Sequence, residues 1–115
     1  MNDETEVGQS FVADMRVRKV LGILQRDFHK HITVTDLASQ VGLSSSRLQH
    51  LFRRTTGRTM KQELKKIRLQ QGLRLLKLRQ LSVKQVCFRI GYCCSQDFSR
   101  DFKRYHGHSP SQVNS

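Results

Sequence analysis

Polar and basic side chains recur at helical spacing on two short stretches of the sequence, residues 45–54 and 95–104. Glutamine can pair with both edge atoms of adenine, and arginine with those of guanine. Serine, lysine and exposed arginine can bind phosphate oxygens, as can the backbone amides at a helix start. Side chains of these types suit a nucleic-acid surface, although a helix face exposed only to solvent would carry similar residues.

Two roles suit these side chains. Gln49, His50, Gln96 and Arg100 are candidates for contacting base edges. We assign the basic residues near each end to phosphates, namely Arg53, Arg54, Lys103 and Arg104. His50 could serve in either role, and Arg100 is the stronger candidate for contacting a base.

Both stretches belong to an internal repeat, in which residue type and spacing agree at nine positions. The first copy holds Thr33, Leu37, Ala38, Val41, Gly42, Leu43, Leu48, Phe52 and Gly57. The second holds Ser82, Val86, Cys87, Ile90, Gly91, Tyr92, Phe98, Phe102 and Gly107, with one extra residue after Gly91. A capping Thr or Ser, a short helix and a glycine turn predict a helix-turn-helix in each copy. The second helix of such a unit fits the major groove, which is about 12 Å wide.

A long basic helix is predicted between the two copies. One apolar row consists of Met60, Leu64, Ile67, Leu75 and Leu78, and a second of Leu69, Leu73 and Leu76. Two apolar rows on one helix require something to bury each of them. Hence the sequence predicts an all-α protein with a loose acidic tail (1–10), a first lobe (11–57), a shared linker helix (58–79) and a second lobe (80–115). The first helix of the first lobe is expected to end near His29.

The charge of the chain is strongly positive and unevenly distributed. The net charge is +12, and four of the nine acids lie in the first 14 residues, which hold no Lys or Arg. Such a chain attracts polyanions. Two alternatives to sequence-specific DNA binding remain open at this stage. One is a non-specific nucleic-acid-binding protein, architectural or RNA-binding, and the other is a basic module that binds acidic proteins or a membrane surface.

Metal binding and catalysis find little support in the sequence. Cys93, Cys94, His106 and His108 lie near the same end of the chain, but no Cys-x-x-Cys pair accompanies them. No nucleophile stands at helical spacing from a base, and no glycine-rich phosphate loop is present. We therefore expect no metal, no cofactor and no enzymatic activity. The odd cysteine count and the lack of a long apolar run predict a cytoplasmic protein without a membrane span.

Two runs of residues resemble the DNA-binding region of the AraC/XylS family. The first run comprises Thr33 to Ala38, Gly42-Leu43-Ser44, Leu48, Phe52 to Arg54 and Gly57. The second comprises Ile90-Gly91-Tyr92, Phe98 to Arg100, Phe102 to Arg104, Gly107 and Ser109-Pro110. The resemblance covers about residues 15 to 113. It implies about seven helices, with two helix-turn-helix lobes that contact successive major-groove segments about 34 Å apart. By position, the resemblance marks as base-edge candidates Ser45, Ser46, Gln49, His50, Ser95, Gln96 and Arg100. The implied partners are double-stranded DNA and RNA polymerase, at the bacterial nucleoid.

Three departures from the family pattern affect these expectations. Gly72 stands inside the linker helix where alanine is common, and we expect it to loosen a hinge between the lobes. Cys93-Cys94 stands before the second recognition helix, where Ser or Asp would cap better. A separate effector-sensing or dimerisation domain, carried by most members, is not in this sequence, which leaves open a stand-alone member or a fragment.

Overall fold

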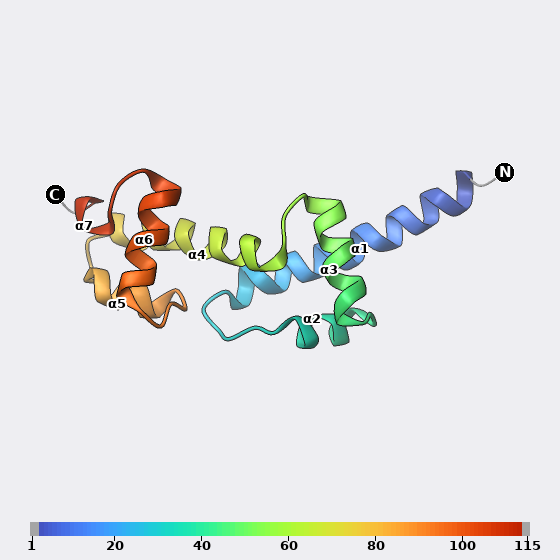
Figure 1. The fold of residues 1–115 in the computed structure, drawn as a ribbon, viewed down its shortest axis with the longest axis horizontal. Coiled ribbons are helices and arrows are strands. Elements are labelled where there is room, and N and C mark those ends of the chain that lie inside the picture. The colour runs from blue at the N-terminus through green and yellow to red at the C-terminus, as the bar shows by residue number, and fades with distance from the viewer. Residues whose placement is uncertain (1–2, 114–115) are drawn as a thin grey trace. The chain divides into compact units, whose positions relative to one another are not determined.

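The computed structural model describes residues 3–113, with side chains from residue 14 onward. These residues form seven helices and no strand, which confirms the all-α prediction (Figure 1). The helices are α1 (Asp3–Asp27), α2 (Val34–Val41), α3 (Ser45–Thr56), α4 (Met60–Lys77), α5 (Val83–Arg89), α6 (Ser95–His106) and α7 (Pro110–Val113). They belong to two compact units. The first holds α1 to α3 and α4 as far as Glu63, and the second holds residues 28–31 and the chain from Leu64 onward.

Helix α1 starts earlier than expected. It begins at Asp3, so residues 3–10 belong to a helix and not to the loose acidic tail that we predicted. Residues 1 and 2 of that tail lie outside the described residues. The sequence favours this extension, because it contains no proline here and carries acids near a helix N-terminus, where negative charge is stabilising. The helix ends at Asp27, slightly before the expected end.

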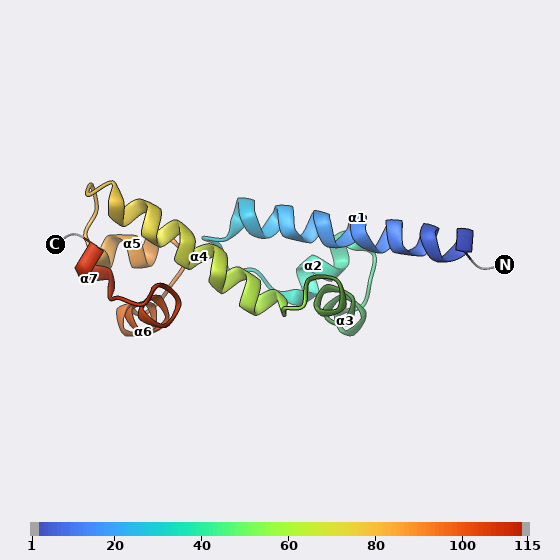
Figure 2. The ribbon, with the colours of Figure 1, turned by 90° about the horizontal axis from the view of Figure 1, so that it is seen from above.

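The core of the first unit forms where α1 packs against α2 and α3 (Figure 2). Its buried side chains are Val17, Val20, Ile23, Leu24, Leu37, Ala38, Val41, Leu48, Phe52 and Met60. Val17, Val20 and Leu24 recur at helical spacing along α1 and lie on its buried face, whereas Leu21 is only half-buried.

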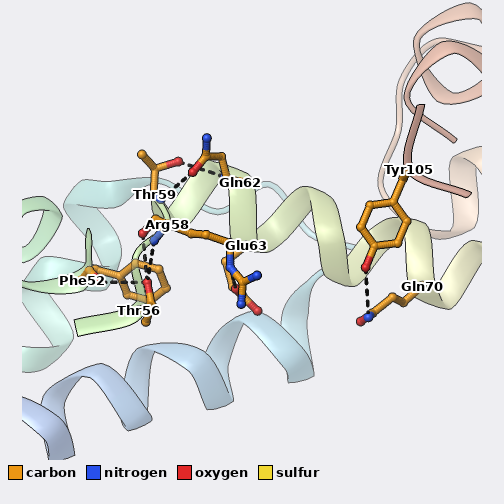
Figure 3. A network of polar contacts seen from close by, with 8 residues as sticks. All are labelled: Phe52, Thr56, Arg58, Thr59, Gln62, Glu63, Gln70 and Tyr105. Carbon is orange, nitrogen blue, oxygen red and sulfur yellow. Dashed lines mark hydrogen bonds and ion pairs between the residues drawn. The ribbon is translucent and has the colours of Figure 1, made fainter. Parts of the chain in front are cut away.

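A polar network fixes the connection from α3 to α4 (Figure 3). Gly57 ends α3 with φ +78°, as the sequence predicted. The Thr59 hydroxyl then accepts from the Gln62 amide at 3.0 Å, while the Thr59 amide donates to Gln62 Oε1 at 2.9 Å. This reciprocal pair is a capping box, and it starts α4 at Met60, two residues later than expected. The buried carboxylate of Glu63 is paired with Arg58 Nε at 3.0 Å.

Helix α4 supplies part of the second unit's core, together with α5 and α6. The buried cluster consists of Leu69, Leu76, Val86, Cys87, Ile90, Phe98 and Phe102. The predicted apolar row ends too late, because Leu78 is 53% exposed. Arg79 has φ +57°, a left-handed conformation that cannot continue a helix, so α4 stops at Lys77.

Gly72 is a packing residue of the second unit and not the hinge that we expected. A Cβ atom at this position would lie 3.2 Å from Ile90 Cδ1 and 3.3 Å from Phe98 Cε1. The missing side chain therefore lets α4 approach the buried core closely. The boundary between the two units falls after Glu63, nine residues earlier in the chain.

A second close approach in this unit involves Gly91 and Arg68. Arg68 Nε donates to the Phe28 carbonyl at 2.7 Å, and its Nη2 donates to the Lys30 carbonyl at 3.0 Å. The guanidinium lies against Gly91, whose φ is +101°. Burial lowers the pKa of Arg68. These two bonds hold the segment 28–31 onto α4.

Candidate DNA interface

The first helix-turn-helix consists of α2 and α3. The Thr33 hydroxyl caps α2 by accepting from the Asp36 amide at 3.1 Å. Gly42 ends α2 in the left-handed region, with φ +71°, and its amide bonds to the Ala38 and Ser39 carbonyls. Ser44 then caps α3, since its hydroxyl accepts from the Arg47 amide at 3.3 Å. The Thr33 cap and the turn at Gly42 match the sequence prediction.

Helix α3 presents most of the predicted side chains to solvent. Those exposed are Ser46, Gln49, His50, Arg53 and Arg54. Ser45 is half-buried, and its hydroxyl lies 3.5 Å from the Thr35 hydroxyl. Arg47 is also exposed on this helix, although we did not single it out. Its position directly before the buried Leu48 could have identified it from the sequence.

The second helix-turn-helix consists of α5 and α6. Ser82 and Gln85 form a full capping box at the start of α5, where the sequence predicted a capping Ser82. The chain turns at Gly91, and Cys94 is the N-cap of α6 without a side-chain cap hydrogen bond. The expected weak start of this helix is thus confirmed. The predicted residues of α6 are all exposed, namely Ser95, Gln96, Arg100, Lys103 and Arg104.

The two helices place their glutamines at different positions. The two helices align when the buried Leu48 and Phe52 are matched with Phe98 and Phe102. In this alignment, Gln49 is the fifth residue of α3, whereas Gln96 is the second residue of α6. By the same alignment, His50 corresponds to Arg100. The two helices therefore offer different side chains at equivalent sites.

Two carboxylates hold the guanidinium of Arg100. Its Nη2 lies 3.4 Å from Asp97 Oδ1, one turn earlier in α6, and its Nε lies 3.5 Å from Asp101 Oδ1. Asp97 is 54% exposed, whereas the side chain of Asp101 is only 7% exposed. Our sequence reasoning missed both acids. The spacing of three residues between Asp97 and Arg100 could have revealed the first of them.

Asp101 is the buried centre of a polar cluster whose other members are partly exposed. The Tyr92 hydroxyl donates to its Oδ2 at 2.9 Å, and Lys65 Nζ lies 3.5 Å from the same oxygen. Burial by itself would raise the pKa of Asp101, but the Tyr92 hydrogen bond and the charges of Lys65 and Arg100 outweigh it, so that this pKa is lowered. Burial and the bond to Asp101 raise the pKa of Tyr92. The carboxylate of Asp101 is thus charged at neutral pH.

The predicted phosphate-binding residues lie near the C-terminal end of each recognition helix. Arg53 and Arg54 occupy the last turn of α3, and Lys103 and Arg104 the last turn of α6. All four are exposed. Positive charge in a last helical turn interacts favourably with the helix dipole, so these residues also fit their helices without DNA.

The groups that could suggest metal chemistry are dispersed. Among the residues that the structure describes, no three His, Cys, Asp or Glu side chains gather as metal ligands would. Cys87 is buried, while Cys93 and Cys94 are exposed free thiols. His106 Nε2 lies 3.0 Å from the Leu69 carbonyl oxygen. Within residues 3–113, no helix is long and apolar enough to cross a membrane.

Comparisons with known proteins agree with this arrangement. The family described as "Helix-turn-helix domain" matches residues 37–115. The Msm operon regulatory protein of Streptococcus mutans is 31% identical over 96 residues, which are 84% of this chain and 34% of that protein. The chain thus spans about a third of the length of the curated relatives that it matches.

Two solved structures share both the fold and part of the sequence. A "probable AraC family transcriptional regulator" from Rhodopseudomonas palustris is 26% identical with a TM-score of 0.80, over 86% of this chain and 94% of that one. The DNA-binding domain of the global transcriptional factor AdpA, solved in complex with a target DNA, is 28% identical with a TM-score of 0.79, over 85% of this chain and 88% of that one. DNA-binding domains of this kind are not an enzyme class. The family match and these two structures show that the chain belongs to the AraC/XylS family of transcription regulators and comprises their helix-turn-helix DNA-binding region.

Proposed function

We propose that this protein recognises two successive major-groove segments of one duplex, with α3 in one and α6 in the other. Two copies of the same helix-turn-helix, each ending in a helix with exposed polar and basic side chains, support this most strongly. A single chain would then contact two boxes about one helical turn apart, as dimers of single helix-turn-helix domains do.

Within each box, the helix would divide its contacts between bases and phosphates. Ser45, Ser46, Gln49 and His50 would approach base edges in one box, and Ser95, Gln96 and Arg100 in the other. The phosphates would be bound by Arg53, Arg54, Lys103 and Arg104. Each phosphate contact releases counterions, so affinity falls steeply with salt concentration.

The whole protein would act on transcription at the bacterial chromosome, in the cytoplasm. RNA polymerase is the partner through which a DNA-bound regulator alters initiation, and a separate effector-sensing or dimerisation domain would supply the signal. The relatives support this, since they are regulators about three times as long as this chain.

Selection of binding sites from random duplexes would test the proposal, followed by a salt titration on the selected duplex and on a random one. We expect a motif with two boxes about 10 base pairs apart, bound at least about a thousandfold more tightly than random DNA. A motif with a single box would mean that one helix recognises bases and the other only contacts backbone. No enrichment, with a steep salt dependence on every duplex, would refute the proposal and leave a charge-driven binder.

Lys103→Ala provides the control for phosphate contacts in this experiment. Because phosphates carry no sequence information, affinity should fall equally on the selected and random duplexes, and the salt slope should decrease by about one unit. An unchanged slope would remove Lys103 from the interface.

A further inference from the structure

Among the differences between the two helix-turn-helix repeats, one pair of equivalent positions changes from apolar to polar. In the first half these positions hold Leu43, after the glycine turn, and Leu51, in the recognition helix, and both are half-buried. In the second half they hold Tyr92 and Asp101, which are joined by a hydrogen bond of 2.9 Å. At these two positions the second repeat therefore holds a hydrogen-bonded polar pair where the first holds an apolar pair.

Stability gives no reason for this exchange. Burying a carboxylate carries a desolvation penalty, and replacing a buried ionic group together with its partners by apolar residues often leaves a protein equally or more stable. Asp101 is charged and nearly buried, so its position carries this desolvation penalty, which its partners outweigh, whereas the equivalent Leu51 carries none. The contacts of Asp101 indicate a role in function instead.

The two oxygens of Asp101 face different partners. Oδ2 is held by the Tyr92 hydroxyl and lies 3.5 Å from Lys65 Nζ, so neighbouring elements fix the orientation of the carboxylate. Oδ1 faces Arg100, whose Nε lies 3.5 Å away. An acceptor at Nε constrains the plane of the guanidinium and leaves its two terminal nitrogens as a fork, which is the part that pairs with N7 and O6 of guanine.

Arg100 itself is well placed for such a contact. Its side chain is 56% exposed, and it lies on the outward face of α6. An unsupported arginine loses much side-chain entropy when it is fixed in one conformation. A buried carboxylate that already restricts the guanidinium reduces this loss at the moment of binding.

We propose that Asp101, held by Tyr92 and Lys65, is a positioning residue that presents Arg100 to a guanine in the second box. This inference rests on the proposed DNA recognition by α6. The fixed negative charge of Asp101 also weakens binding to DNA that lacks this guanine, because it partly neutralises Arg100 and repels phosphates. Asp101 thus raises the preference for one base while lowering affinity for random DNA.

Asp97 is the alternative support for Arg100, and its exposure argues against it. Its Oδ1 lies 3.4 Å from Arg100 Nη2, one of the two fork nitrogens that the guanine would need. Exposed ion pairs of this kind are weak and screened by salt. Asp97→Asn therefore serves as a matched control, since it removes the other carboxylate on Arg100 but leaves the buried cluster intact.

The test compares base preference at the position of the selected motif that Arg100→Ala relaxes. Arg100→Ala should lower that preference roughly tenfold. The double variant Tyr92→Phe/Asp101→Leu restores an apolar pair, as in the first half, and keeps Arg100. It should lower the same preference at least about threefold, while affinity for random duplexes is unchanged or rises. Asp97→Asn should change the preference by about twofold or less.

A merely structural role of the cluster would have a different signature, because a loosened α6 would lose affinity for selected and random duplexes together. Asp101→Asn provides a second variant of native volume, for which we expect the same loss of preference even if the double variant folds poorly. With Arg100 already replaced by Ala, neither change should alter base preference further. Unchanged preference in both Asp101 variants would overturn the inference while two-box recognition stands. A wild-type protein without any base preference would instead refute the proposed function itself.

Discussion

A comparison of Gly91 and Gly107 measures how much the contact between Arg68 and the turn of the second helix-turn-helix contributes to the free energy of unfolding. Both glycines lie in the second unit and have positive φ, at +101° and +86°. A Cβ at Gly107 would meet nothing within 4 Å, whereas one at Gly91 would lie 2.9 Å from Arg68 Nε. Alanine at either position incurs backbone strain, but only at Gly91 must it also displace the guanidinium.

The expected energies follow from these geometries. Left-handed backbone strain for alanine is about 1–2 kcal/mol, so Gly107→Ala should lower the free energy of unfolding by that amount. Displacing Arg68 weakens its bonds to the Phe28 and Lys30 carbonyls. We count one bond from a charged donor, about 1.5–3 kcal/mol, because the side chain can shift and water can reach the exposed carbonyl. Gly91→Ala should therefore cost about 2.5–5 kcal/mol in total.

Urea unfolding followed by far-UV circular dichroism measures both variants, with the slope of the transition as a check on two-state behaviour. Arg68→Ala completes the design, since Gly91→Ala made in that background should cost only the backbone strain seen at Gly107. Equal losses for the two single glycine variants would refute the reasoning. A difference between them that persists without Arg68 would show that Gly91 accommodates something other than the guanidinium.

Other perturbations test the remaining polar contacts. Arg58→Ala leaves the buried carboxylate of Glu63 unpaired and should lower the free energy of unfolding, measured in urea, by about 1–3 kcal/mol. This range is reduced because Arg58 is about half exposed. Adding Glu63→Gln should recover most of the loss. Cys94→Asp should stabilise by about 1 kcal/mol in thermal unfolding by capping α6, and Ser82→Ala should destabilise by a similar amount; no gain at Cys94 would mean that the cap does not limit stability. The lowered pKa of Asp101 contributes stability that is fully present above its ordinary value of 3.8 and is lost as pH falls through the folded pKa. Asp101→Asn should therefore flatten the stability curve below about pH 4, and an unchanged acid limb would contradict the assigned cluster.

Local chemistry made most of the fold predictable. Thr33, Ser44 and Ser82 cap helices where their types and spacing indicate, and Gly42 and Gly57 take the left-handed conformation that ends a helix. These signals act within a few residues, so they can be recognised from the sequence alone.

Helix α4 shows where such local reasoning stops. The capping box of Thr59 and Gln62 was visible in the sequence and was overlooked, which placed the helix start two residues too early. Gly72 was different in kind, because its close neighbours Ile90 and Phe98 come from distant parts of the chain. A glycine inside a helix looks like a weak point until the structure shows what packs against it.

In the candidate interface, too, local features could be predicted from the sequence and contacts between distant residues could not. Helical periodicity correctly placed Gln49, Arg53 and Lys103 on exposed faces. It could not place Lys65 beside Asp101, since Lys65 is 36 residues earlier in the chain. Whether these exposed residues contact bases or phosphates stays a prediction for the binding experiments.

The two recognition helices therefore differ before DNA is bound. Helix α3 starts with its own cap, because the Ser44 hydroxyl already accepts from the Arg47 amide. Helix α6 starts without a side-chain cap, so its first amides lack this acceptor, and a phosphate oxygen could take its place. Beyond that start, Asp101 constrains Arg100, whereas the equivalent position in α3 is the apolar Leu51. The weaker helix start and the added buried charge occur on the same helix, so α6 is less optimised for stability than α3 and more dependent on what it binds.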